Sequence, residues 1–274
     1  MANLKNTTIN NTEYMQLPVG TTAQRPGSPV NGDTRFNSQF KVVETYMDNA
    51  WKYMPAIVES GLVLHLDAAE PASYSGSGTT WSDLSGNGYT ASIQGTNRYT
   101  SLDGGKFDFR GISNITDYII LPHEAAQVTS GAYTLMFWMQ PQSNGTRYFH
   151  SMHNGSDDNY NIMQITTSIQ GYLGGLSISF SNDEWLQLSL VRNGSDTASM
   201  YKNTESPVSS TQPDISAVTS GGWILNQEQD SVGGSFSASQ NAHSAFSVIL
   251  LYNRALSASE IQQNFNALRG RYSI

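Results

Sequence analysis

Two carboxylates stand two residues apart after an apolar run in the last quarter of the chain. The run at 223–225 leads into Glu228-Gln-Asp230, then a Gly-Gly turn at 233–234 and a second apolar run at 246–252. This pattern predicts two buried strands that flank an acidic loop. Because side chains two apart on an extended segment share a face, we expect Glu228 and Asp230 to bring their carboxylates together. Carboxylates so close repel each other, so the pair indicates a bound cation or a shared proton.

The run from Gln227 to Gln240 resembles the calcium loop of pentraxins and related laminin-G-like domains, members of the concanavalin A-like lectin/glucanase fold. The resemblance implies Ca²⁺ ligands from this loop and from an Asp-Asn pair on a separate hairpin. Carried over by position, the metal ligands are Asp158, Asn159, Glu228, Gln229, Asp230 and Gln240. Ser237 stands where the second calcium of the family usually needs an acid, so we expect one ion at most. The alternative that these acids are solvated loop residues stays open.

The same fold houses glycoside hydrolases, so catalysis has to be weighed. Retaining glucanases of this class place Glu-x-Asp-x-x-Glu on one strand, whereas here Gly233 takes the position of the acid/base. No other segment offers that pattern, a nucleophile elbow or a phosphate loop. We therefore expect no enzymatic activity, with a glycoside hydrolase as the remote alternative. In a calcium-dependent glycan-binding module, Tyr160 would be the ring that stacks on a sugar.

Charge and composition exclude several classes of function. The net charge is −8 and only 14 residues are Lys or Arg, which argues against nucleic acid as a partner. The chain has no cysteine, which excludes disulfides, thiolate metal sites and cysteine nucleophiles. The N-terminus lacks the apolar core of a signal peptide, and no apolar run approaches the ~20 residues of a membrane span. We expect synthesis in a cytoplasm and no membrane contact.

Short apolar runs at regular spacing predict a β sandwich rather than alternating strands and helices. In the run 186–191, Leu residues alternate with Gln, Ser and Val, as expected where one face packs on a second sheet. The closing segment begins with the capping box Ser257-Ala-Ser-Glu260 and predicts a helix with an apolar stripe. The strands are expected at 33–36, 41–46, 50–53, 61–67, 106–110, 118–121, 133–140, 147–152, 161–167, 176–180, 186–192, 197–202, 222–225 and 246–252.

Three further phrases resemble a laminin-G-like jelly roll. They are Gly-Leu-Val-Leu-His-Leu-Asp-Ala from 61, Trp-Leu-Gln-Leu-Ser-Leu-Val-Arg from 185 and Leu-Tyr-Asn-Arg-Ala-Leu from 251. The resemblance implies an all-β fold over residues 57–274, a two-sheet antiparallel jelly-roll sandwich of the concanavalin A-like kind with a short C-terminal helix. A small N-terminal β arm over residues 1–56 precedes it.

This N-terminal arm has too little chain to bury its own rings. Three prolines lie within 17–29, and the meander that follows carries six large apolar side chains. Fewer than about 40 residues rarely form an independent core without disulfides, metal or association. We therefore expect the arm to dock on copies of itself, on the following domain or on another protein. A mere linker is the alternative, against which the aromatic content speaks.

The pattern over residues 14–54, with Leu-Pro-Val-Gly-Thr-Thr-Ala-Gln-Arg-Pro and Gly-Asp-Thr-Arg-Phe-Asn, resembles modules of bacteriophage fibres and other virion appendages. It implies a structural protein of the virion (tail fibre, appendage or capsid decoration), commonly a homotrimer, bound to other virion proteins through residues 1–56. The jelly roll would then face outward. The alternative is a calcium-dependent adhesin that recognises a glycan on the host surface.

Overall fold

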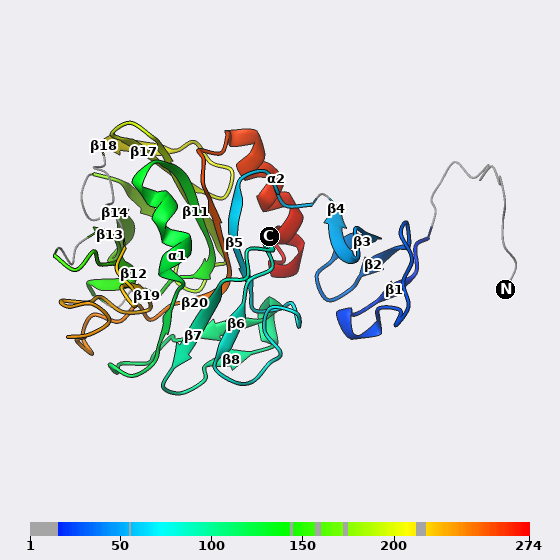
Figure 1. Ribbon diagram of the computed structural model, residues 1–274, viewed down its shortest axis with the longest axis horizontal. Coiled ribbons are helices and arrows are strands. Elements are labelled where there is room, and N and C mark those ends of the chain that lie inside the picture. The colour runs from blue at the N-terminus through cyan, green and yellow to red at the C-terminus, as the bar shows by residue number, and fades with distance from the viewer. Residues whose placement is uncertain (1–15, 55, 143–144, 157–159, 172–174, 212–217) are drawn as a thin grey trace, which may run out of the picture.

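The computed structural model describes residues 16–54, 56–142, 145–156, 160–171, 175–211 and 218–274 (Figure 1). From β5 onward the chain forms two large antiparallel sheets packed face to face, with two short α helices, α1 (His123–Ala126) and α2 (Ala258–Leu268). The all-β jelly-roll sandwich predicted from the sequence is confirmed. Among the described residues, no helix is both long and apolar enough to cross a membrane.

Both sheets combine runs of consecutive strands with strands that are distant in the sequence. The first contains, in spatial order, β15 (Ser177–Ser179), β14 (Ser168–Gly171), β13 (Tyr160–Ile165), β12 (Arg147–Met152), β19 (Trp223–Leu225), β10 (Tyr118–Ile120), β7 (Thr90–Gln94) and β6 (Thr80–Ser82). The second contains β18 (Val208–Thr211), β17 (Thr197–Lys202), β16 (Leu186–Asn193), β11 (Ala132–Gln140), β20 (Ala245–Tyr252), β9 (Lys106–Asp108) and β8 (Tyr99–Thr100), and β5 (Leu62–Asp67) also pairs with β20.

The second sheet is buried on both faces. Leu186, Leu188 and Leu190 of β16 face the other sheet, as predicted. The polar residues between them do not face solvent, however, because α2 covers the outer face of this sheet. Gln187 is fully buried, and its Nε2 donates to the carbonyl of Ile261 in α2 over 3.3 Å. The predicted packing of one face on the other sheet is confirmed, and the opposite face of this strand is buried as well.

A second hydrophobic core lies on the outer face of that sheet and contains Trp138 of β11. Its ring stacks on Phe265 of α2, with centroids 5.6 Å apart, and on Tyr272 of η4 (Arg269–Tyr272), with centroids 4.5 Å apart. Burial of such rings contributes strongly to stability, so this helical end of the chain is part of the core.

Helix α2 begins with the capping box that the sequence predicts. The Ser257 side chain accepts from the backbone N–H of Glu260, and the Glu260 carboxylate accepts from the backbone N–H of Ser257 over 2.8 Å. Arg254 lies 2.6 Å from the same carboxylate. Its hydrogen bond, together with the backbone hydrogen bond from Ser257, lowers the pKa of Glu260 from its ordinary 4.5 to about 2.

The substitution Glu260→Gln is expected to lower the free energy of unfolding at pH 7 by about 0.5–1 kcal/mol. Gln can keep the capping box, but the ion pair with Arg254 and the negative charge at the helix N-terminus are lost. The folded pKa of Glu260 is depressed, so its contribution is complete above pH 4.5 and is lost as the pH falls toward 2. The difference between Glu260→Gln and the natural protein should therefore shrink over this range in urea titrations. Glu205→Gln, at an exposed position, is the control and should show no such pH dependence.

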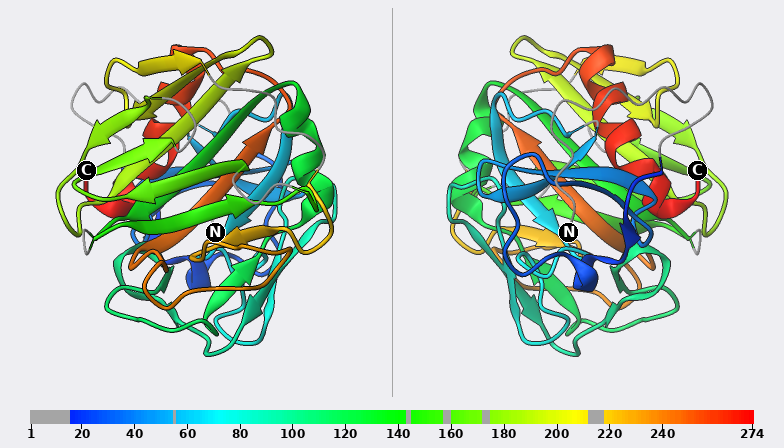
Figure 2. Two further views of the ribbon diagram at one scale, coloured as in Figure 1. Left: turned by 90° about the vertical axis from the view of Figure 1, so that its left-hand side faces the viewer. Right: turned by 90° about the vertical axis from the view of Figure 1, so that its right-hand side faces the viewer.

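The N-terminal segment folds as a separate four-stranded sheet. Its order is β1 (Val19–Gly20), β2 (Thr34–Asn37), β3 (Val42–Met47) and β4 (Ala50–Met54), with β1 parallel to β2 and the short 3-10 helix η1 (Thr22–Gln24) between them in sequence. Figure 2 shows this sheet, in blue, in front of β5 and beside α2. Phe40, Val42 and Tyr53 belong to the same core as α2 and β11. Of the three docking partners expected for the arm, the structure shows the following domain.

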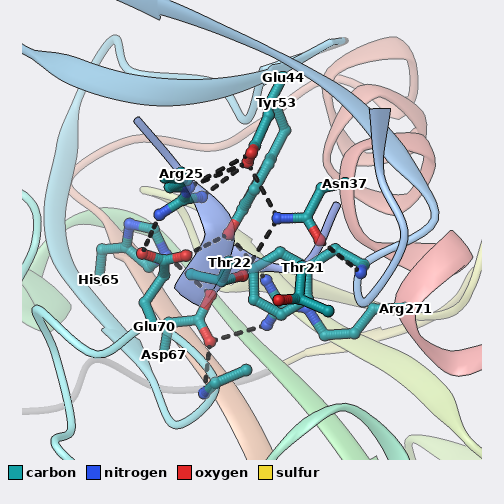
Figure 3. Close-up of polar contacts among 12 residues, drawn as sticks. Thr21, Thr22, Arg25, Asn37, Glu44, Tyr53, His65, Asp67, Glu70 and Arg271 are labelled. Atoms are coloured by element: carbon teal, nitrogen blue, oxygen red, sulfur yellow. Dashed lines mark hydrogen bonds and ion pairs between the residues drawn. The ribbon is translucent and has the colours of Figure 1, made fainter. Parts of the chain in front are cut away.

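The face of this small sheet that turns toward the jelly roll combines polar and aromatic side chains, since Tyr53 pairs with Glu44 on it. Arg35, Asn37 and Glu44 are buried on it, whereas Phe36 is only half-buried on the opposite face. The ring of Phe36 is thus not sheltered by the jelly roll, unlike those of Phe40 and Tyr53. Arg25 lies 2.7 Å from Glu44 and 3.2 Å from Glu70 of the jelly roll, so it bridges the two parts (Figure 3).

A second buried ion pair completes this junction. Arg271 of η4 lies 2.7 Å from Asp67 of β5, and neither side chain is more than 1% exposed. The Arg271 guanidinium lies 4.1 Å from the ring centroid of Phe40 and donates to the Tyr53 hydroxyl over 3.2 Å. Burial alone would lower the pKa of Arg271, but Asp67 and the adjacent tyrosines hold it well above its ordinary value. The junction is thus both packed and charge-paired.

Candidate functional site

The acidic loop leaves β19 before it reaches its first carboxylate. The strand ends at Leu225, and Asn226 has a φ of 76°, in the left-handed region. The alternation of an extended strand therefore does not carry through to Glu228 and Asp230. Glu228 is 4% exposed, whereas Asp230 is exposed. The convergence of the two carboxylates stays a prediction, because the backbone turns between the strand and the acids.

Gln229 holds the loop against the sandwich through its side chain. Its Nε2 donates to the carbonyl of Gly222 over 2.9 Å and to the Ser151 hydroxyl over 3.0 Å. Its Oε1 accepts from the backbone N–H of Gly233 over 2.8 Å, and Gly233 adopts a φ of 64° that favours glycine. The sequence predicts Gln229 as a metal ligand. In the structure its side chain also holds the loop against the sandwich.

Two residues that sequence reasoning did not single out also fix the loop. The amide of Gln227 donates to the carbonyl of Asn114 over 2.7 Å. The Ser151 hydroxyl of β12 donates to the carbonyl of Gln227 over 3.0 Å. Gln227 opens the run that resembles a calcium loop, but nothing in the sequence indicates these contacts, because the partners lie 113 and 76 residues apart. Together they make the approach to Glu228 rigid.

The later predicted ligand, Gln240, is tied to the same sheet by its backbone. Its carbonyl accepts from the N–H of Tyr148 over 2.8 Å, and its own N–H donates to the carbonyl of Ser237 over 2.9 Å. Tyr148 belongs to β12, which pairs with β19. The structure therefore brings both ends of the acidic loop to one pair of strands, while the role of Gln240 as a metal ligand stays a prediction.

The hairpin half of the predicted calcium site is only partly described. Asp158 and Asn159 lie outside the described residues, and Tyr160 begins β13, where its backbone pairs with Met152 of β12. Within the described ranges, no three His, Asp or Glu side chains gather as a group able to hold a metal ion. The described loop offers one buried and one exposed carboxylate, so it does not form a calcium cage by itself.

The loop lies at the far end of the molecule from the N-terminal sheet. Figure 1 shows the segment after β19, in orange, on the left, and strands β1 to β4 on the right. Whatever the loop contacts is therefore well separated from whatever the N-terminal sheet contacts.

Solved structures with the same fold include proteins of quite different names. The binding domain of paraclostridial mosquitocidal protein 1 is 16% identical, with a TM-score of 0.53 over 76% of this chain and 52% of that one. A mutant of Trypanosoma rangeli sialidase with trans-sialidase activity is 13% identical, with a TM-score of 0.55 over 87% and 44%. The binding domain of botulinum neurotoxin DC in complex with SialylT is 12% identical, with a TM-score of 0.51 over 77% and 52%.

The chain thus spans about half the length of these structures, and at such identities the likeness concerns the fold alone. No curated protein matches the sequence. The profile of the concanavalin A-like lectin/glucanases superfamily, in its laminin G form, matches residues 113–262, more than half of the chain. These residues include β11, β16 and β20 together with the acidic loop. The chain therefore belongs to the concanavalin A-like lectin/glucanases superfamily.

Proposed function

We propose that this chain is a structural component of a bacteriophage virion, attached through residues 1–56 and presenting its lectin-like jelly roll outward. The protein would work by binding and architecture, without a catalytic step. Attachment requires a surface at one end of the molecule that does not pack on the jelly roll. The N-terminal sheet offers such a surface.

The observation that carries this proposal is an apolar row on the outer face of the N-terminal sheet. The strand register pairs Val19 with Phe36, Phe36 with Val43, and Val43 with Met54, one residue from each strand. Directly paired residues point to the same side of a sheet, so these four side chains form a continuous row. Val19 is 61% and Met54 49% exposed. Apolar surface of this kind is typical of contact with another protein.

Substitution of this row is expected to abolish self-association without unfolding the chain. We propose a homotrimer, so light scattering should report three copies for the natural protein and one for Val19→Lys/Met54→Lys. The charges would be desolvated at the contact but remain in water in the monomer. Gln39→Lys, at an exposed position in the turn between β2 and β3, is the matched control and should stay trimeric. A monomer for all three proteins would contradict the trimer.

The location on a virion is tested on particles. An antibody against the jelly roll should label intact, purified particles of the phage that encodes the chain, and the chain should sediment with them. With Val19→Lys/Met54→Lys, the label should be lost from particles while the chain accumulates in the lysate. A natural chain that stays wholly in the lysate supernatant would contradict the virion role.

The second candidate is a calcium-dependent glycan-binding adhesin, favoured by the buried Glu228 at the braced start of the acidic loop. The ion would be held by Asp158, Asn159, Glu228, Gln229, Asp230 and Gln240, and a host glycan would contact Tyr160. When bound, Ca²⁺ would supply a positive charge that orients sugar hydroxyls. A glycoside hydrolase is the remote alternative, because Gly233 supplies no third carboxylate.

Calcium is expected to raise the melting temperature of the natural protein and not of Glu228→Gln. A ligand that binds only the folded state stabilises it by about 2.7 kcal/mol at a concentration 100 times its Kd. Glu184→Gln, which removes a carboxylate remote from the loop in sequence, should keep the full calcium response. Equal shifts for Glu228→Gln and Glu184→Gln would contradict a calcium site in this loop.

A further inference from the structure

A cleft of about 620 Å³ opens at the junction between the N-terminal sheet and the jelly roll. One wall is formed by β4 and the turn before it, with Trp51 and Asp48, and the other by the jelly roll, with His65, Glu70 and Ser85. Small-molecule sites occupy roughly 300–1,000 Å³ and occur preferentially where two structural units meet. The cleft has the size and the place of a binding site, and it is remote from the acidic loop.

The cleft combines an aromatic ring with a half-buried apolar lining. Ile57, Leu62 and Leu84 line it and are half-buried, so they present part of their surface to the cleft. Trp51 is also half-buried, and its ring is held by an edge contact with Tyr46, with centroids 5.6 Å apart. A fixed indole beside apolar side chains is suited to the flat, apolar face of a sugar ring.

The charges in the cleft are already compensated within its walls. Arg25 lies between Glu44 and Glu70, and Figure 3 shows its guanidinium held from both sides. Lys52 Nζ lies 2.7 Å from Glu59 and 3.3 Å from Asp48. Each cation of the lining therefore already contacts two carboxylates. A sulfate, a phosphate or the carboxylate of a sialic acid would have to compete with these contacts.

The lining as a whole carries more carboxylates than cations. Asp48, Glu59 and Glu70 face Arg25 and Lys52. Burial lowers the pKa of His65, so the imidazole is neutral near pH 7 and does not change this balance. Carboxylate oxygens are strong acceptors for hydroxyl donors, which an uncharged polyol supplies in number.

We propose that this junction cleft binds an uncharged saccharide, with the Trp51 ring against the sugar face and the carboxylates of Asp48 and Glu70 accepting from its hydroxyls. The site is independent of the acidic loop and of calcium. It is also independent of particle attachment, because Trp51 lies on the face of the sheet opposite the apolar row. A bound saccharide would contact both structural units at once and stabilise their junction.

Trp51 provides a direct readout of this site in the full chain. The other four tryptophans, Trp81, Trp138, Trp185 and Trp223, are at most 8% exposed. Acrylamide quenching of tryptophan fluorescence therefore reports mainly on Trp51. Lactose, maltose and chitobiose are the uncharged probes and sialylated lactose is the charged one. At least one uncharged probe should protect against quenching, with a Kd in the millimolar range or tighter, in EDTA as well as in calcium.

Calorimetry on variants separates this site from the calcium loop. Trp51→Ala should weaken the binding of the protecting saccharide at least tenfold, and Trp51→Phe, which keeps a ring and the packing, should weaken it less. Tyr118→Ala, a half-buried aromatic position outside the cleft, and Glu228→Gln should leave the affinity unchanged. A melting curve confirms that each variant is folded.

Several results would overturn the proposal. They are a lack of quenching protection by any uncharged probe at tens of millimolar, tighter binding of sialylated lactose than of lactose, and equal affinity in Trp51→Ala. Loss of saccharide binding in Glu228→Gln or in EDTA would assign the sugar to the acidic loop, in support of the adhesin and against the cleft.

Discussion

Arg271→Ala is expected to lower the free energy of unfolding by about 3–5 kcal/mol, the usual cost of removing one partner from a buried ion pair. The pair with Asp67 is buried on both sides, and the Asp67 carboxylate has no access to water. Without Arg271, that charge keeps the hydrogen bond from the backbone N–H of Ala69, over 2.9 Å, and the His65 imidazole at 4.0 Å. The cation contacts with Phe40 and Tyr53 disappear as well. Urea unfolding followed by circular dichroism measures the change.

A matched control uses an arginine pair of similar distance at the surface. Arg254 and Glu260 are 2.6 Å apart, but both side chains are about 30% exposed. Arg254→Ala should cost about 1 kcal/mol or less, because exposed ion pairs contribute little. Adding Asp67→Asn to Arg271→Ala removes the uncompensated charge and should recover part of the loss. If Arg271→Ala cost no more than Arg254→Ala, the buried pair would not hold the junction.

The sandwich itself was predictable because its strands alternate clearly. Leu186, Leu188 and Leu190 lie on the inner face of β16 as their spacing indicates, and the box at Ser257 and Glu260 begins α2 as predicted. The outer face of the same strand was not predictable. Gln187 resembles a solvent-facing residue until α2, more than seventy residues later, covers it. A period of two identifies a strand, but it cannot tell which of its faces another element will cover.

The burial of polar residues in the N-terminal sheet could not be predicted from local periodicity either. Its rings indicated a segment that must dock, and Phe40 and Tyr53 do pack on the jelly roll. The docked face also carries Arg35, Asn37 and Glu44, however, which a pattern of polar residues in a strand assigns to solvent. Their burial depends on partners such as Arg25 and Thr22, and pairings of this kind are not encoded in local periodicity.

The acidic loop was predictable as a motif but not as a geometry. The two-residue spacing of Glu228 and Asp230 predicts a shared face only if the strand continues through them. The strand ends at Leu225, before either acid. Asn is among the few residues that adopt positive φ without great strain, and Asn226 does so at the first position after the strand. That backbone angle turns the chain away from the line of β19 before it reaches the two acids.

Phe40→Ala is expected to destabilise the whole chain by about 3–5 kcal/mol, the range for a large aromatic removed from a core. Phe40 is 2% exposed, and its ring meets Tyr53 edge to face with centroids 5.5 Å apart. Gly270 packs against the backbone of Phe40 and Lys41, since a Cβ there would lie 2.8 Å from the carbonyl oxygen of Lys41. A cavity at Phe40 would therefore open between the N-terminal sheet and the end of the jelly roll. Urea unfolding measured by Trp fluorescence and by circular dichroism should show one shared transition at a lower midpoint.

The effects of Phe40→Ala and Arg271→Ala should not add. The guanidinium of Arg271 lies over the Phe40 ring, so each single variant already removes their contact, and a double-mutant cycle should give a coupling of about 0.5–3 kcal/mol. Val30→Ala is the control, because Val30 is 65% exposed in the same N-terminal segment and should change stability by about 0.5 kcal/mol or less. Additive losses, or two separate transitions in the natural protein, would mean that the sheet and the jelly roll unfold independently. A single transition with coupling would instead mean that anything bound in the cleft between them stabilises the whole chain.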